Sequence, residues 1–162
     1  MGSICVDVAS YHFKKNGSDL VRAASLGSSI CTGIYDPAVK TGGLYIFVFP
    51  DSSQATSVDP DKYPLLYADT GLMKFFSEAR NEYKIDLEHA KIAVCGGAHF
   101  LDAFGGGQLG KKNCEAACQF FEKIGIKPGL IQIGGLENYS LEINLKTGEL
   151  QVEVCSGEVK TL

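Results

Sequence analysis

The chain lacks several features that mark large classes of protein. Its 19 Asp and Glu residues outnumber its 15 Lys and Arg residues, for a net charge of −4, and the basic residues form no run. Phosphate neutralisation needs clustered positive charge, so no nucleic-acid partner is expected. The longest apolar stretch, residues 44–50, is far shorter than the roughly 20 residues of a membrane-spanning helix. Membrane insertion is therefore not expected either.

The N-terminus also lacks the successive basic and apolar regions of a secretory signal peptide. A cytoplasmic location is therefore predicted. The length of 162 residues is most simply one domain, residues 1–162, that is large enough to bury a proper core.

Six cysteines are present, but they are spread through apolar segments of a chain that does not need disulfides to fold. In a cytoplasmic protein they are expected to be reduced. Cys114 and Cys118 have the spacing of one helical turn, which would place two thiolates on one metal. No second Cys or His pair at finger-like spacing accompanies them. Small core side chains are therefore the better interpretation, and neither a metal nor a cofactor is expected.

Hydrophobic periodicity predicts an α+β fold. Short apolar or alternating runs predict strands at residues 4–13, 29–35, 44–49, 91–95, 130–133, 139–145 and 150–154. Apolar stripes predict two helices, one over residues 69–83 and one that Asn113 caps and Gly125 ends. The polar stretch at residues 51–63 is expected to be a long mobile loop. Strand runs interrupted by only two helices favour α+β over a doubly wound sheet.

Two neighbouring segments carry the strongest functional signal, because residues 26–37 read LGSSICTGIYDP and residues 41–50 read TGGLYIFVFP. Further marks follow in order: YAD at 67–69, CGGAHF at 95–100, KKN at 111–113, GI at 125–126, GG at 134–135 and KTGE at 146–149. Together they resemble the CheD family, whose members deamidate chemoreceptor glutamines in bacterial and archaeal chemotaxis. The resemblance covers residues 20–155. It implies two packed β-sheets flanked by helices, a fold related to the catalytic domain of cytotoxic necrotizing factor toxins.

The same resemblance implies a catalytic set that this chain does not carry. The family pairs a Cys nucleophile with a His base, and here these two positions hold Ser29 and Ile46. A Thr that precedes the nucleophile by six residues in characterised members falls on Ala23. A Ser hydroxyl depends wholly on a positioned base, and Ile cannot accept a proton. Losing nucleophile and base as a unit costs up to about 10⁶ in rate, so the usual deamidase reaction is not expected.

A rewired amidohydrolase site is the alternative. Cys31 lies two residues beyond Ser29, so on a strand the two side chains face the same way, roughly 6.6 Å apart. Either of them, with His99 as the base, would make an active protein-glutamine deamidase. A Cys in an apolar run is more often a core residue, and a single loop His is more often a surface group.

A third hypothesis concerns residues 105–111, GGGQLGK, which satisfy the GxxxxGK pattern of a phosphate-binding loop. Lys112 stands where Ser or Thr would hold Mg²⁺, and no buried strand leads directly into the segment. A Gly-rich turn before a helix is the simpler interpretation.

The preferred interpretation is a CheD-like pseudoenzyme that acts by protein-protein interaction. Its expected partners are chemoreceptor cytoplasmic helices or a CheC-type phosphatase of the response regulator CheY, as the family resemblance implies. The interface is expected to comprise three parts: Gly42 and Gly43, Gly96 and Gly97 beside His99, and Lys111 and Lys112. The two lysines would offer positive charge to an acidic helix.

Overall fold

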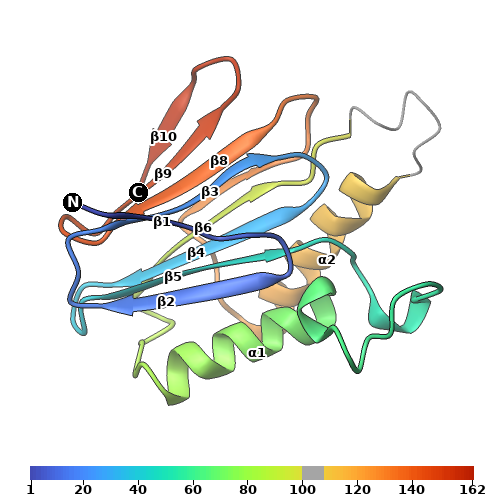
Figure 1. Ribbon diagram of the computed structural model, residues 1–162, viewed down its shortest axis with the longest axis horizontal. Helices are drawn as coiled ribbons and strands as arrows, with labels where there is room; N and C mark the ends of the chain where they lie inside the picture. The colour runs from blue at the N-terminus through green and yellow to red at the C-terminus, as the bar shows by residue number, and fades with distance from the viewer. Residues whose placement is uncertain (100–107) are drawn as a thin grey trace.

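The structure, a computed structural model, describes residues 1–99 and 108–162. The described residues form two five-stranded sheets with α1 (Ala68–Asn81) and α2 (Leu109–Ile124) on one side (Figure 1). The first sheet has the order β1-β3-β8-β9-β10, with β1 (Ser3–Cys5), β3 (Leu20–Leu26), β8 (Tyr139–Asn144), β9 (Glu149–Val154) and β10 (Val159–Thr161). The second has the order β2-β5-β4-β6-β7, with β2 (Ser10–Lys15), β5 (Thr41–Phe47), β4 (Ile30–Asp36), β6 (Lys91–Gly96) and β7 (Leu130–Ile133). The predicted α+β fold is confirmed.

The two sheets differ in how their strands are buried. Every residue of β4 and β5 is buried, because one face of the second sheet packs on the first sheet and the other packs on the helices. Strands covered on both faces read as continuous runs of apolar and small residues, as IFVF and ICTGI do here. In the first sheet β8 and β9 alternate between buried and less buried positions, which is typical of a sheet with one solvated face.

The buried side chains form two clusters, one on each face of the second sheet. The inner core lies between the sheets and includes Val21, Ala23, Cys31, Ile46 and Leu141. The outer core lies between the second sheet and the helices, and it is rich in aromatic residues such as Tyr45, Phe47, Phe75, Phe76 and Phe121.

The helices have the apolar stripes that the sequence predicts, with differences in detail. α1 approaches β5 closely because Gly71 has no side chain, since a Cβ there would lie 1.7 Å from the Tyr45 hydroxyl. Gly125 ends α2 in the left-handed conformation, with φ 70°, as predicted. Asn113 does not cap α2. The helix begins four residues earlier at Leu109, and the Asn113 side chain is buried.

Several strand predictions were wrong. The stretch 4–13 is not one strand, because the chain turns through Ala9, with φ 56°, and passes from β1 in the first sheet to β2 in the second. Strands β3 and β10 were missed. β3 has a polar middle and an irregular register between Ala23 and Leu26, and β10 is three exposed residues paired with β9. Their partners, rather than their own periodicity, hold them in the sheet.

The segment before α1 contains little regular structure, as expected for a loop. It holds two short 3₁₀ turns, η1 (Ser52–Gln54) and η2 (Pro64–Leu66). None of the helices in the described part of the chain is long and apolar enough to cross a membrane.

Candidate functional site

The hairpin of β4 and β5 brings the family's catalytic positions together. Ser29 directly precedes β4, and Cys31 pairs with Ile46 across the hairpin. Ala23 lies on β3 of the facing sheet and belongs to the same inner core as Cys31 and Ile46. The chain therefore gathers these positions at one place, as the family resemblance implies, but apolar side chains occupy the interior.

The interior of this hairpin is dry. Cys31 has no exposed surface, and burial, with a smaller contribution from the neighbouring Cys95, raises the pKa of its thiol well above the ordinary value. Ile46 beside it is 2% exposed and offers no proton acceptor. A thiol in such surroundings stays protonated and is a poor nucleophile. The structure therefore favours the core interpretation of Cys31.

The backbone around Ser29 is held by the glycine loop that follows β6. Gly97 N–H donates to Ser29 O over 2.9 Å, and Ala98 N–H donates to Gly27 O over 2.9 Å. A Cβ on Gly96 would lie 2.1 Å from the Ser29 carbonyl oxygen, and Gly96 has φ +115°. Only glycine suits this close approach. Ser29 itself is only partly buried.

His99 turns away from the hairpin. The backbone N–H of His99 donates to Gly135 O over 2.8 Å. The ring Nε2 lies 3.2 Å from the point where a Cβ on Gly134 would stand. This places the ring beside the turn after β7, which borders β6 on the side opposite β4. Within residues 1–99 and 108–162, no hydrogen bond links His99 to Ser29 or Cys31. The rewired catalytic pair is not assembled in the structure.

Gly42 and Gly43 lie far from the other predicted binding glycines. Gly42 pairs with Tyr35 near the hairpin turn, whereas Gly96 pairs with Ile30 at the opposite end of β4. Ile30 and Tyr35 are five residues apart on the strand, so the two glycine pairs are separated by about 17 Å. The three predicted parts of the interface therefore do not share one surface.

The two hairpin glycines have a packing role instead. A Cβ on Gly43 would lie 2.4 Å from the Phe13 ring, and one on Gly42 would lie 2.8 Å from Leu145. Both positions are buried between strands. Because they have no side chain, Phe13 of the outer core and Leu145 of the inner core can pack against their backbone.

Lys111 and Lys112 are adjacent in sequence and both exposed, but they face different surroundings. Only Lys112 lines a cleft. Residues 105–107 of the predicted phosphate loop lie outside the described residues. Gly110, which follows them, is buried inside α2, where a Cβ would lie 2.1 Å from Ala98 O. Gly110 therefore serves to dock α2 on the glycine loop.

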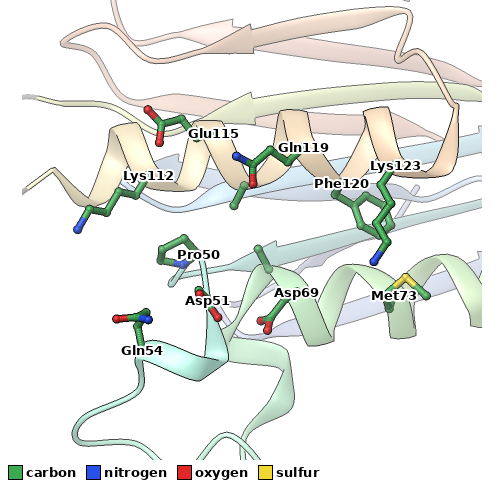
Figure 2. Close-up of a pocket in the computed structure, with 12 residues that line it drawn as sticks. Pro50, Asp51, Gln54, Asp69, Met73, Lys112, Glu115, Gln119, Phe120 and Lys123 are labelled. Carbon is green, nitrogen blue, oxygen red and sulfur yellow. The ribbon is translucent and has the colours of Figure 1, made fainter.

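A cleft between the helices was missed by sequence reasoning. It lies between α1, α2 and the segment after β5, and has a volume of about 590 Å³. A second cleft of about 280 Å³ continues it toward the start of α2, since both are lined by Pro50, Asp51, Gln54 and Lys112. We call the two together the α1–α2 groove. Figure 2 shows its charged side chains coming from α2 on one side and from α1 and the Pro50 segment on the other.

The α1–α2 groove carries side chains of both signs of charge. Lys112, Glu115 and Lys123 line it from α2, and Asp51 and Asp69 line it from the other side. None of the five takes part in an ion pair with any residue that the structure describes. The spacing of Lys112 and Lys123 along α2, on the face away from the core, is the sequence pattern that could have predicted this surface.

The acidic wall is held in place by local hydrogen bonds. Asp69 accepts from the Ser52 N–H over 3.0 Å and from the Ser52 hydroxyl over 2.5 Å. Asp51 accepts from Ser53 N–H over 2.8 Å and so caps η1. The segment after β5 is thereby tied to the first turn of α1.

Asn113 joins α2 to the hairpin from behind the groove. It is fully buried, and its Nδ2 donates to Ser28 O over 2.9 Å and to Val48 O over 2.8 Å. The side chain therefore fixes α2 against the two hairpin strands, at the start of β4 and just past the end of β5.

The two cysteines on α2 differ in exposure. No group of three metal-ligating side chains occurs in the part of the chain that the structure describes. Cys118 is exposed, contrary to its predicted core position, whereas burial raises the pKa of Cys114 to about 11.

Comparison with known proteins identifies the relatives of this chain. The family model described as CheD chemotactic sensory transduction matches residues 48–154. The chain is similar to a probable chemoreceptor glutamine deamidase CheD 1 of Syntrophus aciditrophicus, 31% identical over 167 residues and 100% of both chains. It is also 32% identical over 153 residues to a chemoreceptor glutamine deamidase CheD of Thermotoga maritima, covering 94% of this chain and 92% of that one. The match to the family model begins just after β5, beyond the altered hairpin.

Proposed function

Because the chain belongs to the CheD family, we propose that it is a chemotaxis protein that has lost glutamine deamidation and acts by binding a chemoreceptor. The relatives are named for acting on chemoreceptors, and a domain that keeps their fold keeps the basis for recognising the same partner. Receptor cytoplasmic helices are the proposed partner, and the cytoplasm is the proposed location. A CheC-type phosphatase is the alternative partner.

The observation that carries the loss of catalysis is the apolar interior of the β4–β5 hairpin. The buried Ile46 occupies the position of the family's histidine base. Ser29 occupies the position of the family's cysteine nucleophile. The nearest thiol, Cys31, is protonated because burial raises its pKa. Amide hydrolysis needs an activated nucleophile and a group to carry the proton. Neither is present at these positions.

Incubation of the purified protein with receptor cytoplasmic fragments tests both halves of the proposal. Mass spectrometry should detect no Gln-to-Glu conversion above a heat-inactivated control, while a pull-down should retain the fragment. Deamidation by the wild type would overturn the loss of catalysis. Capture of a CheC-type phosphatase, with no retention of receptor, would replace the proposed partner.

A restored catalytic set sharpens this test. We expect the variant Ser29→Cys, Ile46→His, Ala23→Thr to regain measurable deamidation, because Ala23 and Ile46 belong to one core cluster and Ser29 directly precedes the strand that pairs with Ile46. Its rate should stay well below that of an intact enzyme, since misplacement by about 1 Å costs about 10²-fold. Ser29→Cys alone is the matched control. It lacks a base and should remain inactive.

A further inference from the structure

The α1–α2 groove is the main surface of the described residues that the altered catalytic positions do not explain. None of Ala23, Ser29, Cys31 or Ile46 lines it. Along α2 it extends from Gln108 to Lys123, which is 15 residues of helix or about 22 Å. It is long, open to solvent and bordered by charge, whereas sites for small ligands enclose most of the ligand's surface. An elongated partner suits it better.

The lysines of α2 that line the groove lie in one stripe. Glu115 and Lys123 lie 3 and 11 residues after Lys112, and Lys112 and Lys123 fall on the same face of the helix. Figure 2 shows the Glu115 carboxylate on the side of α2 away from Asp51 and Asp69. Between the two lysines lie Phe120, almost buried, and Met73 of α1, which is 49% exposed. In Figure 2 the Lys123 side chain extends from α2 toward Met73, with Lys112 at the opposite end of the groove. Along α2 the order is therefore positive, apolar and positive, and Asp51 and Asp69 on the opposite wall make the part near Lys112 negative.

The opposite wall supplies the negative charge of the groove. Asp51 and Asp69 face the groove opposite the part of α2 that carries Lys112 and Glu115. A helix lying alongside α2 is complementary when it presents an acid near Lys112, a base near Asp51 and Asp69, and an acid near Lys123. On that helix the two acids stand about 11 residues apart on one face, with the base and an apolar side chain between them.

We propose that the α1–α2 groove docks one cytoplasmic helix of a chemoreceptor through such a mixed-charge face. This inference rests on the proposed receptor-binding function and adds the surface, the polarity pattern and the residues that read it. Met73, which is half exposed, supplies the apolar contact. The charged rim sets register and association rate, as rim charges do in other interfaces.

A pair of adjacent lysines provides the matched test. Lys112 lines both halves of the groove, whereas its exposed neighbour Lys111 lines neither. We expect Lys112→Glu to weaken binding of a receptor cytoplasmic fragment about fivefold or more, and the double variant Lys112→Glu, Lys123→Glu to weaken it further. Lys111→Glu changes the net charge equally and should bind within about twofold of the wild type. Binding is measured by titration at low salt, where surface charges are least screened.

A photo-cross-linking probe locates the partner without changing the charge. Benzoylphenylalanine in place of Met73, inside the groove, should cross-link to the receptor fragment. The same probe in place of Val159 on β10, which is 51% exposed and lines no part of the groove, should not.

The outcomes separate the two proposals. A wild type that binds no receptor fragment overturns the proposed function and the docking inference together. Receptor binding that Lys112→Glu and Lys111→Glu affect equally, or cross-links that form from position 159 and not from position 73, overturn the inference alone. Selective loss with Lys112→Glu, together with cross-links from position 73, supports both.

Discussion

The interior of the β4–β5 hairpin and the α1–α2 groove differ in almost every property that bears on function. In the hairpin interior, Cys31 and Ile46 are 0% and 2% exposed and pack among other apolar side chains. The groove is open and carries unpaired charges such as Lys112 and Lys123. Among the residues that the structure describes, the first region is packed core and the second presents charged side chains to solvent.

The difference has a physical origin in where the family's catalytic positions point. Ala23 and Ile46 face the inner core, so apolar residues at these positions add hydrophobic burial and remove the cost of burying polar groups. Apolar packing at these two positions therefore stabilises the fold. The groove residues gain nothing from becoming apolar, because they face solvent. The family match, which begins at residue 48, includes both groove helices and omits the hairpin.

The largest effect expected from this comparison is on stability. Ile46→Ala should lower the free energy of unfolding by about 2 to 5 kcal/mol, because it leaves a cavity between the two sheets. Met73→Ala, in the groove, should change it by no more than about 0.5 kcal/mol, since half of that side chain already contacts solvent. Urea denaturation of both variants measures the difference. Similar losses from the two substitutions would break the contrast between a packed interior and an open groove.

Thiol reactivity offers the next contrast. Cys31 is fully buried with a raised pKa, whereas Cys118 on α2 is exposed. Iodoacetamide near neutral pH should modify Cys31 more than about a hundredfold more slowly, because reaction requires the core to open. Peptide mapping against time gives the two rates. Fast alkylation of Cys31 that His99→Ala abolishes would instead support a rewired enzyme.

A smaller effect on the free energy of unfolding is expected at Tyr45, which connects the hairpin to the segment before α1. The Tyr45 hydroxyl donates to Leu65 O over 2.7 Å and so ties β5 to the segment that leads into α1. Tyr45→Phe leaves that carbonyl without its partner and should cost about 1 to 2 kcal/mol of stability. Tyr63→Phe is the control, since Tyr63 is 48% exposed and should change stability by less than about 0.5 kcal/mol. Equal effects in thermal or urea unfolding would show that the Tyr45 bond does not couple the regions.

Much of the fold was accessible from local patterns. The stripes of both helices, the C-cap at Gly125 and the apolar runs of β4, β5 and β6 were predicted near their observed positions. Strand β10 was not, because its three exposed residues acquire strand geometry only by pairing with β9. The sequence around Ala9 likewise did not predict that the chain passes there from one sheet to the other.

For the candidate site, the sequence predicted the chemistry of individual residues but not their positions relative to one another. The sequence by itself determined that Ser29 and Ile46 replace a nucleophile and a base, because residue identity decides proton chemistry wherever the chain is folded. Only the tertiary structure decided that Gly42 and Gly96 lie at opposite ends of β4, and that Lys112 lines the groove while Lys111 does not. Local periodicity reports which face of its own element a residue occupies. Which other element meets that face depends on strand register and helix docking, and these are set by contacts between residues far apart in the chain.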